Sequence, residues 1–255
     1  MLPKNLPIKY TDRMSKKLAI FDIDGTLFRW QLYHELIYRL KDQGYFPPAV
    51  STKLDEAFLG WTSRHRSFRD YETEMIELSS AHLPSIPVDA FEQAARDVVA
   101  SSGHKVYRYT RDLLARLKSE GYYCLALSGS QQEVVEQFAP HYGFDDWIGT
   151  IFERDGNAFT GQITRFVPYS KGRIITGYAK EHGFDLADAI AIGDSGGDTA
   201  ILEVVGHPIA VNPNEELLAI ATANRWPVVI ERKNISYELE TREDGEIVVK
   251  NTTIY

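Results

Sequence analysis

Two stretches of this sequence combine a short continuous apolar run with acidic residues at its end. The first is residues 17–26, which ends in Asp22-Ile23-Asp24-Gly25-Thr26, and the second is residues 189–198, which ends in Gly193-Asp194-Ser195-Gly196-Gly197-Asp198. An apolar run without polar alternation is typical of a strand that is buried on both faces, as strands of parallel sheets are. The glycines let the backbone turn directly after each run. Both stretches therefore predict buried strands that bring carboxylates to one edge of a sheet.

Strand and helix patterns alternate through the second half of the chain. Apolar strand patterns lie at residues 122–127, 189–192 and 208–211, and helical patterns lie at residues 104–120, 131–141, 172–182 and 198–205. Alternation of this kind predicts an α/β fold, with a mainly parallel sheet and helices on both of its faces. Ligands of such folds bind at the carboxyl ends of the strands.

A long helical stretch separates the first strand from the second. From Gln31 the apolar residues follow helical spacing, and further helices are expected at residues 51–60, 68–83 and 89–101. About seventy residues of helix greatly exceed an ordinary crossover connection. We therefore predict three parts: a discontinuous core of residues 1–30 and 101–235, an inserted all-helical domain of residues 31–100, and a C-terminal hairpin of residues 236–255.

Composition narrows the class of protein. The 255 residues are 44% hydrophobic, which is enough for a full core, and the net charge of -8 argues against a nucleic-acid partner. The single cysteine, Cys124, excludes an internal disulfide framework and indicates a reducing compartment. Residues 1–17 lack an apolar leader segment, and no apolar run is long enough to span a membrane. We expect a cytoplasmic protein without a membrane partner, whereas the oligomeric state has no signal in the sequence.

The acidic strand ends are the candidate site. Asp22 and Asp24 are two residues apart in extended chain, so they face the same side, although Asp-Gly is also a common turn pair. For Asp194 a plain structural explanation is weaker. Together, Asp22, the Asp24 region and Asp194 would form a hard oxygen site of the kind that Mg²⁺ prefers, completed by waters and a substrate phosphate.

Other strand and helix ends carry further polar residues. Ser130 and Glu133 have the spacing of a capping box, and a helix amino terminus there would suit a phosphate. Ser128 could instead belong to a plain polar turn. Lys171 precedes a helix, where the helix dipole disfavours a cation unless an anion is near, but it could also be a solvated surface lysine. Asp198 could be a helix N-cap.

These residues, taken in order, resemble the four motifs of the haloacid dehalogenase superfamily: Asp22-Ile23-Asp24-Gly25-Thr26, Ser128, Lys171 and Gly193-Asp194-Ser195-Gly196-Gly197-Asp198. The resemblance covers roughly residues 17–230. The helical insert is similar to the cap of the phosphoserine-phosphatase-like branch, subfamily IB. The resemblance implies a Rossmann-like three-layer core with an all-helical cap, and a Mg²⁺-dependent phosphomonoester hydrolase that acts on a small phosphorylated metabolite.

The resemblance also implies a role for each acid. Asp22 would attack phosphorus and form an aspartyl-phosphate, while Asp24 would protonate the leaving group and then activate water. Asp194 and the Asp24 carbonyl would share Mg²⁺ with Asp22. Because family members that are dehalogenases or transporting ATPases usually lack the second acid, Asp24 favours a phosphatase or a phosphotransferase. A non-catalytic binding protein that kept the fold is a further alternative.

The remaining motif residues would bind the substrate or support the site. By resemblance, Ser128, with Gly129, and Lys171 hold the phosphate, and Asp198 supports the metal and the lysine. At Gln31 the phosphoserine phosphatases carry a glutamate that meets the substrate amino group. Gln31 has no such charge, so phosphoserine is expected to be a poor substrate, unless Gln31 is only a first-turn helix residue with no substrate role.

Overall fold

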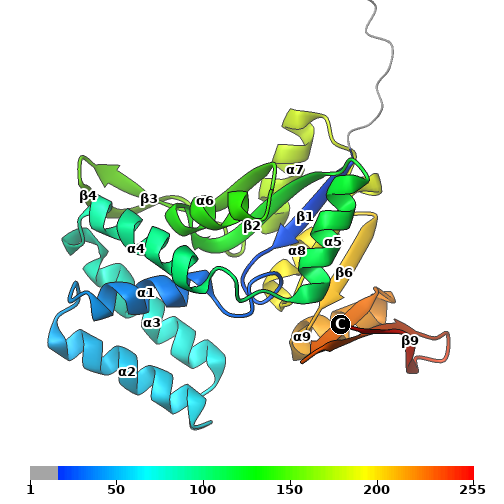
Figure 1. Ribbon diagram of the computed structural model, residues 1–255, viewed down its shortest axis with the longest axis horizontal. Coiled ribbons are helices and arrows are strands. Elements are labelled where there is room, and N and C mark those ends of the chain that lie inside the picture. Colours follow the sequence, from blue (N-terminus) through cyan, green and yellow to red (C-terminus); the bar gives the residue numbers. More distant parts are fainter. Residues whose placement is uncertain (1–16) are drawn as a thin grey trace, which may run out of the picture.

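The computed structural model describes residues 17–255, and within them the strands form a nine-stranded sheet in the order β4-β3-β2-β1-β5-β6-β7-β8-β9 (Figure 1). The strands are β1 (Leu18–Asp22), β2 (Tyr123–Gln131), β3 (Asp146–Asp155), β4 (Ala158–Arg165), β5 (Ile190–Gly193), β6 (His207–Val211), β7 (Val228–Arg232), β8 (Ile235–Thr241) and β9 (Ile247–Ile254). Pairs from β3 through β7 are parallel, whereas β4, β8 and β9 are antiparallel additions at the two edges. The predicted α/β fold with a mainly parallel sheet is confirmed.

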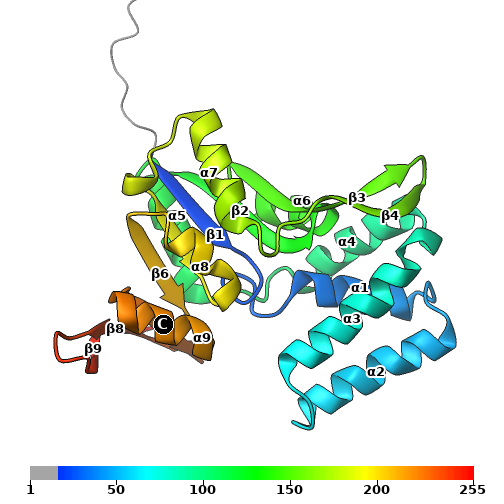
Figure 2. The ribbon, with the colours of Figure 1, turned by 180° about the vertical axis from the view of Figure 1, so that it is seen from behind.

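Helices cover both faces of this sheet, and further helices form an insert after β1 (Figures 1 and 2). They are α1 (Leu32–Asp42), α2 (Pro48–Thr62), α3 (Phe68–His82), α4 (Val88–Ser102), α5 (Arg108–Ser119), α6 (Gln132–His141), α7 (Lys171–His182), α8 (Thr199–Leu202) and α9 (Glu215–Asn224).

The core has three layers, with helices on either side of the sheet, and the side chains of β1 alternate between the two helical layers. Ala19 and Phe21 belong to a core cluster shared with α5 and α6, whereas Leu18 and Ile20 belong to a second cluster shared with α7, α8 and α9. All four side chains are fully buried, as the continuous apolar run predicts for a strand covered on both faces.

The topology reverses the order of the strands beside β1. The chain runs from β1 to β2 and β3 on one side and then returns to β5 on the other side of β1, so the strand order reverses beside β1. Reversal points of this kind are where ligands bind in open α/β sheets. The acids of the sequence therefore lie at the position where a ligand is expected.

The helical insert, α1–α4, occupies the chain between β1 and α5. Figures 1 and 2 show α2 and α3 lying side by side at the end of the molecule away from α7. The limits of the predicted domains stay a prediction, and residues 1–16 of the predicted core lie outside the described part of the chain. None of the helices between residues 17 and 255 is both long and apolar enough to cross a membrane.

Several elements differ from their predicted bounds, and two helices begin or end several residues from the expected position. The helix expected at residues 104–120 begins only at Arg108, because Val106 forms a bridge with Phe28 in the loop after β1. The helix expected at residues 198–205 is the short α8, which ends at Leu202. At the C-terminus, β8 and β9 form an antiparallel hairpin that pairs with β7 and extends the sheet.

Candidate active site

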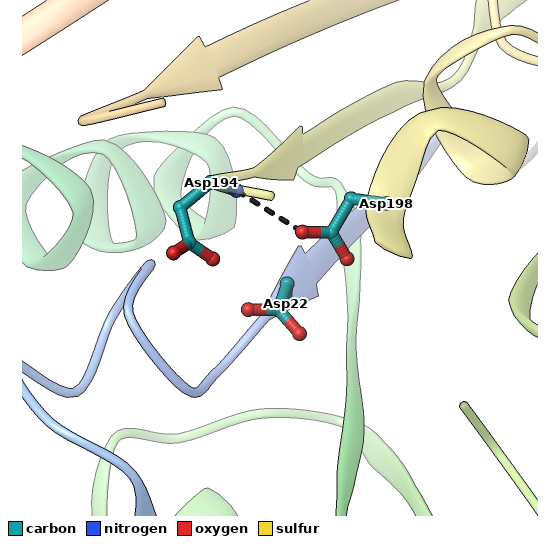
Figure 3. Close-up of side chains that lie close together, drawn as sticks. All are labelled: Asp22, Asp194 and Asp198. Atoms are coloured by element: carbon teal, nitrogen blue, oxygen red, sulfur yellow. Dashed lines mark hydrogen bonds between the residues drawn. The ribbon is translucent and has the colours of Figure 1, made fainter. Parts of the chain in front are cut away.

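Three aspartates, Asp22, Asp194 and Asp198, lie close together at the carboxyl end of β1 (Figure 3). Asp22 is the last residue of β1 and is 3% exposed. Lys171, the first residue of α7, places its Nζ 2.5 Å from Asp22 Oδ1 and 2.6 Å from Asp198 Oδ1. The alternative of a solvated surface lysine is therefore wrong, since Lys171 is 7% exposed and lies between two carboxylates.

Asp198 is held by backbone groups of the loop after β5. Its Oδ2 accepts hydrogen bonds from the backbone N–H groups of Asp194 and Ser195, each at 3.1 Å, and also from the Ser195 hydroxyl. Figure 3 marks the first of these bonds. With Lys171 on Oδ1, both oxygens of Asp198 are in use, and its side chain makes no capping bond to α8. Its contacts fix the loop and the lysine.

The turn after β1 touches the loop after β5. Gly25 has a φ of +89°, and a Cβ at this position would lie 2.2 Å from Asp194 Oδ2. Glycine is thus required both by the backbone conformation and by the close approach of the carboxylate. Thr26 then donates from its hydroxyl to Asp194 Oδ1 at 3.0 Å. Sequence reasoning did not assign this contact to Thr26.

Burial and mutual repulsion control the charges of the cluster. Burial, together with the neighbouring Asp198 carboxylate, raises the pKa of Asp22 to about 7, although Lys171 opposes the shift. Burial and the repulsion of Asp22 and Asp198 raise the pKa of Asp194 as well. Burial alone would lower the pKa of Lys171, but the two carboxylates beside it raise that pKa. Lys171 therefore stays cationic at neutral pH, and the acids would gain from a further cation.

Asp24 lies in different surroundings from Asp22. Its Oδ2 accepts hydrogen bonds from the hydroxyls of Ser128, at 2.5 Å, and Ser130, at 2.8 Å. Its Oδ1 accepts from the backbone N–H of Leu32, the first residue of α1, at 2.6 Å. The Asp24 carboxylate thus joins the end of β2 to the start of the helical insert.

The predicted capping box of Ser130 and Glu133 is wrong. Helix α6 begins at Gln132, and its N-cap residue makes no side-chain capping bond. The Ser130 hydroxyl is used by Asp24, and Glu133 accepts a hydrogen bond from Arg154 at 2.5 Å. A signal for the true contact exists in the sequence, because Ser128 and Ser130 are two residues apart and face the same side of a strand.

The other predicted substrate-binding residues border this network. Ser128 is fully buried near the end of β2, and Gly129 follows it, where a Cβ would touch Pro168 at 3.3 Å. Gln31 is the partly exposed N-cap residue of α1 but makes no side-chain capping bond. The structure thus brings Asp24 and Ser128 into direct contact, with Gln31 directly before Leu32.

The cluster has the composition of a divalent-cation site. One carboxylate oxygen from each of Asp22, Asp194 and Asp198 lies within 4.8 Å of the others. Asp22 Oδ2 is buried and has no hydrogen-bond partner among the described residues. Oxygen ligands and an orphaned buried carboxylate oxygen both fit a hard cation. The Asp24 carboxylate is outside this group, so only its backbone carbonyl remains as a candidate ligand from Asp24.

The sequence of the chain is similar to those of several phosphatases. The chain is 27% identical to the phosphoserine phosphatase of Archaeoglobus fulgidus over 83% of its own length, but it spans only 57% of that protein. It is 26% identical to the phosphoserine phosphatase of Methanocaldococcus jannaschii, over 76% of this chain and 85% of the other. It is 25% identical to the histidinol-phosphatase of Neisseria meningitidis, over 84% of this chain and 98% of the other.

Solved structures share the fold. A protein of unknown function from Bordetella pertussis superposes with a TM-score of 0.69 at 22% identity, over 86% of this chain and 99% of the other. A phosphoserine phosphatase solved as a phospho-aspartyl intermediate analogue superposes with a TM-score of 0.58 at 21% identity, over 86% and 95% of the two chains. The haloacid dehalogenase-like hydrolase family matches residues 19–203, and the predicted phosphoserine-phosphatase-like branch is confirmed. The chain belongs to the haloacid dehalogenase-like hydrolase family.

Proposed function

We propose that the chain is a cytoplasmic, Mg²⁺-dependent phosphomonoester hydrolase that acts on a small phosphorylated metabolite through an aspartyl-phosphate on Asp22. The observation that carries this proposal is the state of the Asp22 carboxylate. Its Oδ1 is held by Lys171, whereas its buried Oδ2 has no partner among the described residues. A carboxylate with one oxygen fixed and the other free is arranged as a nucleophile.

The positions of the two aspartates support a two-step reaction. The Asp22 carboxylate attacks phosphorus while the bond from phosphorus to the leaving oxygen breaks, and Asp24 donates a proton to that oxygen, so a neutral alcohol departs. Asp24, now ionised, takes a proton from water, and the resulting hydroxide attacks phosphorus and releases Asp22. Lys171 keeps the nucleophile in place and offers positive charge to the phosphate, while Ser128 contributes a hydroxyl donor.

The acid cluster supports a bound metal in this scheme. Asp22 and Asp194, with the Asp24 carbonyl, would hold Mg²⁺, while Asp198 supports the loop and the lysine because its own oxygens are already in use. When bound, Mg²⁺ neutralises and orients the phosphate.

Gln31 bears on the substrate class. The relatives that carry the name phosphoserine phosphatase or histidinol-phosphatase act, by their names, on phosphates of amino alcohols. The Gln31 amide makes no capping bond to α1, so it is available to a ligand near Asp24. A neutral amide can bind a hydroxyl or a carbonyl but cannot neutralise an ammonium group. We therefore propose a phosphorylated alcohol or sugar rather than phosphoserine.

A panel of phosphorylated metabolites tests the function. Phosphate release is measured with the purified protein in Mg²⁺, after chelation of the metal, and with the Asp22→Asn variant. We expect release from at least one phosphorylated alcohol or sugar, and loss of release in both of the other conditions. An Asp22→Asn variant that is folded and releases phosphate at a near-normal rate would contradict the proposal. Added alcohols distinguish hydrolysis from transfer, because a transferase would form new phosphate esters.

A further inference from the structure

The first helix of the insert lacks its own amino-terminal cap. The N-cap residue Gln31 makes no side-chain bond, although the first N–H groups of any helix need partners from outside the helix. The N–H of Leu32 donates to Asp24 Oδ1 at 2.6 Å, and the N–H of Tyr33 donates to Ser130 Oγ at 3.0 Å. Two core side chains at the candidate active site therefore cap helix α1.

Ser130 is the residue that connects these groups. Its hydroxyl proton goes to Asp24 Oδ2 at 2.8 Å, and its oxygen accepts from the Tyr33 N–H. The side chain is 3% exposed, so water does not compete freely for either bond. With its single proton and an oxygen lone pair both engaged, the Ser130 hydroxyl has a fixed orientation. That orientation defines where Asp24 Oδ2 lies.

Ser128 donates to the same oxygen of Asp24, but the proposed function also requires the Ser128 hydroxyl for the substrate. Its hydroxyl also donates to Asp24 Oδ2, at 2.5 Å, and accepts from the Ser130 N–H at 2.9 Å. Under the proposed function, Ser128 donates to the substrate phosphate, and a hydroxyl has only one proton to give. When the phosphate takes that proton, Ser130 remains as the hydroxyl donor to Asp24.

We propose that Ser130 is a positioning residue that holds Asp24 for proton transfer and links its orientation to helix α1. The proposal rests on the proposed function, in which Asp24 protonates the leaving oxygen as the bond to phosphorus breaks. Loss of the Ser130 hydroxyl would let the Asp24 carboxylate rotate away from that oxygen. The first step would then slow for leaving groups that need a proton, but not for leaving groups that depart as a stable anion.

Two substrates separate positioning of the acid from a general structural effect. An alkyl phosphate needs a proton on its leaving oxygen, whereas an aryl phosphate such as p-nitrophenyl phosphate can release a stable phenolate. We compare the first step alone, measured as release of the leaving alcohol or phenolate in a single turnover, because the second step needs Asp24 to activate water for both substrates. We expect Ser130→Ala to lower the rate of this first step about tenfold to a hundredfold for the alkyl phosphate and less than about threefold for the aryl phosphate, because a misplaced group costs this much in rate. The substrate concentration that half-saturates the first step should change little for either substrate.

Two further variants complete the test. Ser130→Cys keeps nearly the same size with a weaker donor, and it should shift the alkyl-to-aryl ratio in the same direction, so it also serves if Ser130→Ala does not fold. Ser236→Ala is the matched control, because Ser236 is another buried serine but lies in β8 with its hydroxyl against Tyr255. It should leave the ratio unchanged.

The outcomes distinguish the two proposals. If the wild type releases phosphate from neither substrate, the proposed function fails and the role of Ser130 fails with it. If the wild type is active but both rates fall equally in Ser130→Ala and Ser130→Cys, or neither rate falls, only the role of Ser130 is overturned. A selective fall for the alkyl phosphate supports it.

Discussion

The two aspartates at the end of β1 lie two residues apart but in unlike surroundings. Asp22 belongs to a charged cluster, defined here as Asp22, Lys171, Asp194 and Asp198, on the side of α7 and α8. Asp24 belongs to a hydroxyl network, defined as Asp24, Ser128 and Ser130, on the side of the helical insert. The charged cluster lies within the core, whereas the hydroxyl network also contacts the backbone of α1.

The two carboxylates of this site therefore have different properties: Asp22 is held rigidly, whereas Asp24 can exchange its hydrogen-bond partners. Buried charges are costly unless they are paired, so the charged cluster holds its nucleophile rigidly and needs its lysine. Neutral hydroxyl donors are cheaper to rearrange, so the network around Asp24 can exchange partners when a substrate enters. The same network also fixes the start of α1, so the position of the insert and the orientation of Asp24 depend on each other.

The largest expected effect is that of removing the cation. Lys171→Met leaves Asp22 and Asp198 buried side by side without the cation between them, and we expect the free energy of unfolding to fall by about 3–5 kcal/mol. Ser130→Ala removes two hydrogen bonds, one to the Asp24 carboxylate and one from the Tyr33 N–H, but it leaves no pair of buried like charges, and it should cost about 2 kcal/mol. Denaturant titration of both variants measures the difference. If the free energy of unfolding fell equally in the two variants, the charged cluster would not depend on its cation more than the hydroxyl network depends on Ser130.

The next effect is the pH dependence of stabilisation by Mg²⁺. An acid whose pKa is raised on folding binds its proton more tightly when folded, so for Asp22 the free energy of unfolding falls as pH rises from 3.8 to about 7. Mg²⁺ binds the ionised form and removes this penalty, adding about 2.7 kcal/mol at a hundred times its Kd. The rise in Tm on adding Mg²⁺ should therefore be larger at pH 8 than at pH 5.5.

The same titration has a matched variant. Asp194→Asn should reduce the Mg²⁺-induced rise in Tm at pH 8, because it removes a carboxylate from the cluster. A rise in Tm that is independent of pH, or one that is unchanged in Asp194→Asn, would show that Mg²⁺ binds elsewhere.

The smallest effect concerns substrate choice beside the hydroxyl network. Gln31→Glu adds a carboxylate next to the start of α1, and a charge-assisted hydrogen bond to an ammonium group contributes on the order of 1–3 kcal/mol. We expect the ratio of kcat/KM for a phosphorylated amino alcohol to that for a phosphorylated sugar to rise roughly five- to hundredfold. An unchanged ratio, or efficient phosphoserine hydrolysis by the wild type, would show that Gln31 does not select the substrate.

The charged cluster was more predictable from sequence than the hydroxyl network. Asp22 and Asp194 end continuous apolar runs, so strand periodicity alone places them at one edge of the sheet. Lys171 carries only a weak local signal, its place at a helix start, where the dipole disfavours a cation unless an anion is near. Its partners are 149 and 27 residues away in the chain, so only the family resemblance indicated its role.

The hydroxyl network was missed because local and distant contacts compete for the same side chain. Ser130 and Glu133 have the spacing of a capping box. The Ser130 hydroxyl instead donates to Asp24, which is 106 residues away in the chain. The start of α1 was predicted to within one residue, but its capping groups were not, because they come from the core rather than from the residues that precede the helix. Spacing rules describe only partners that are near in sequence.

Direct detection of the phosphorylated aspartate tests the central claim. Asp24→Asn should still let Asp22 attack an aryl phosphate, but it cannot activate the water that releases the product. With p-nitrophenyl phosphate and Mg²⁺, we predict about one equivalent of phenolate and a phosphoryl group on the peptide that contains Asp22, detected by mass spectrometry of acid-quenched protein. The Asp22→Asn variant should carry none. An adduct on another residue, or steady turnover by Asp24→Asn without any adduct on Asp22, would contradict the account.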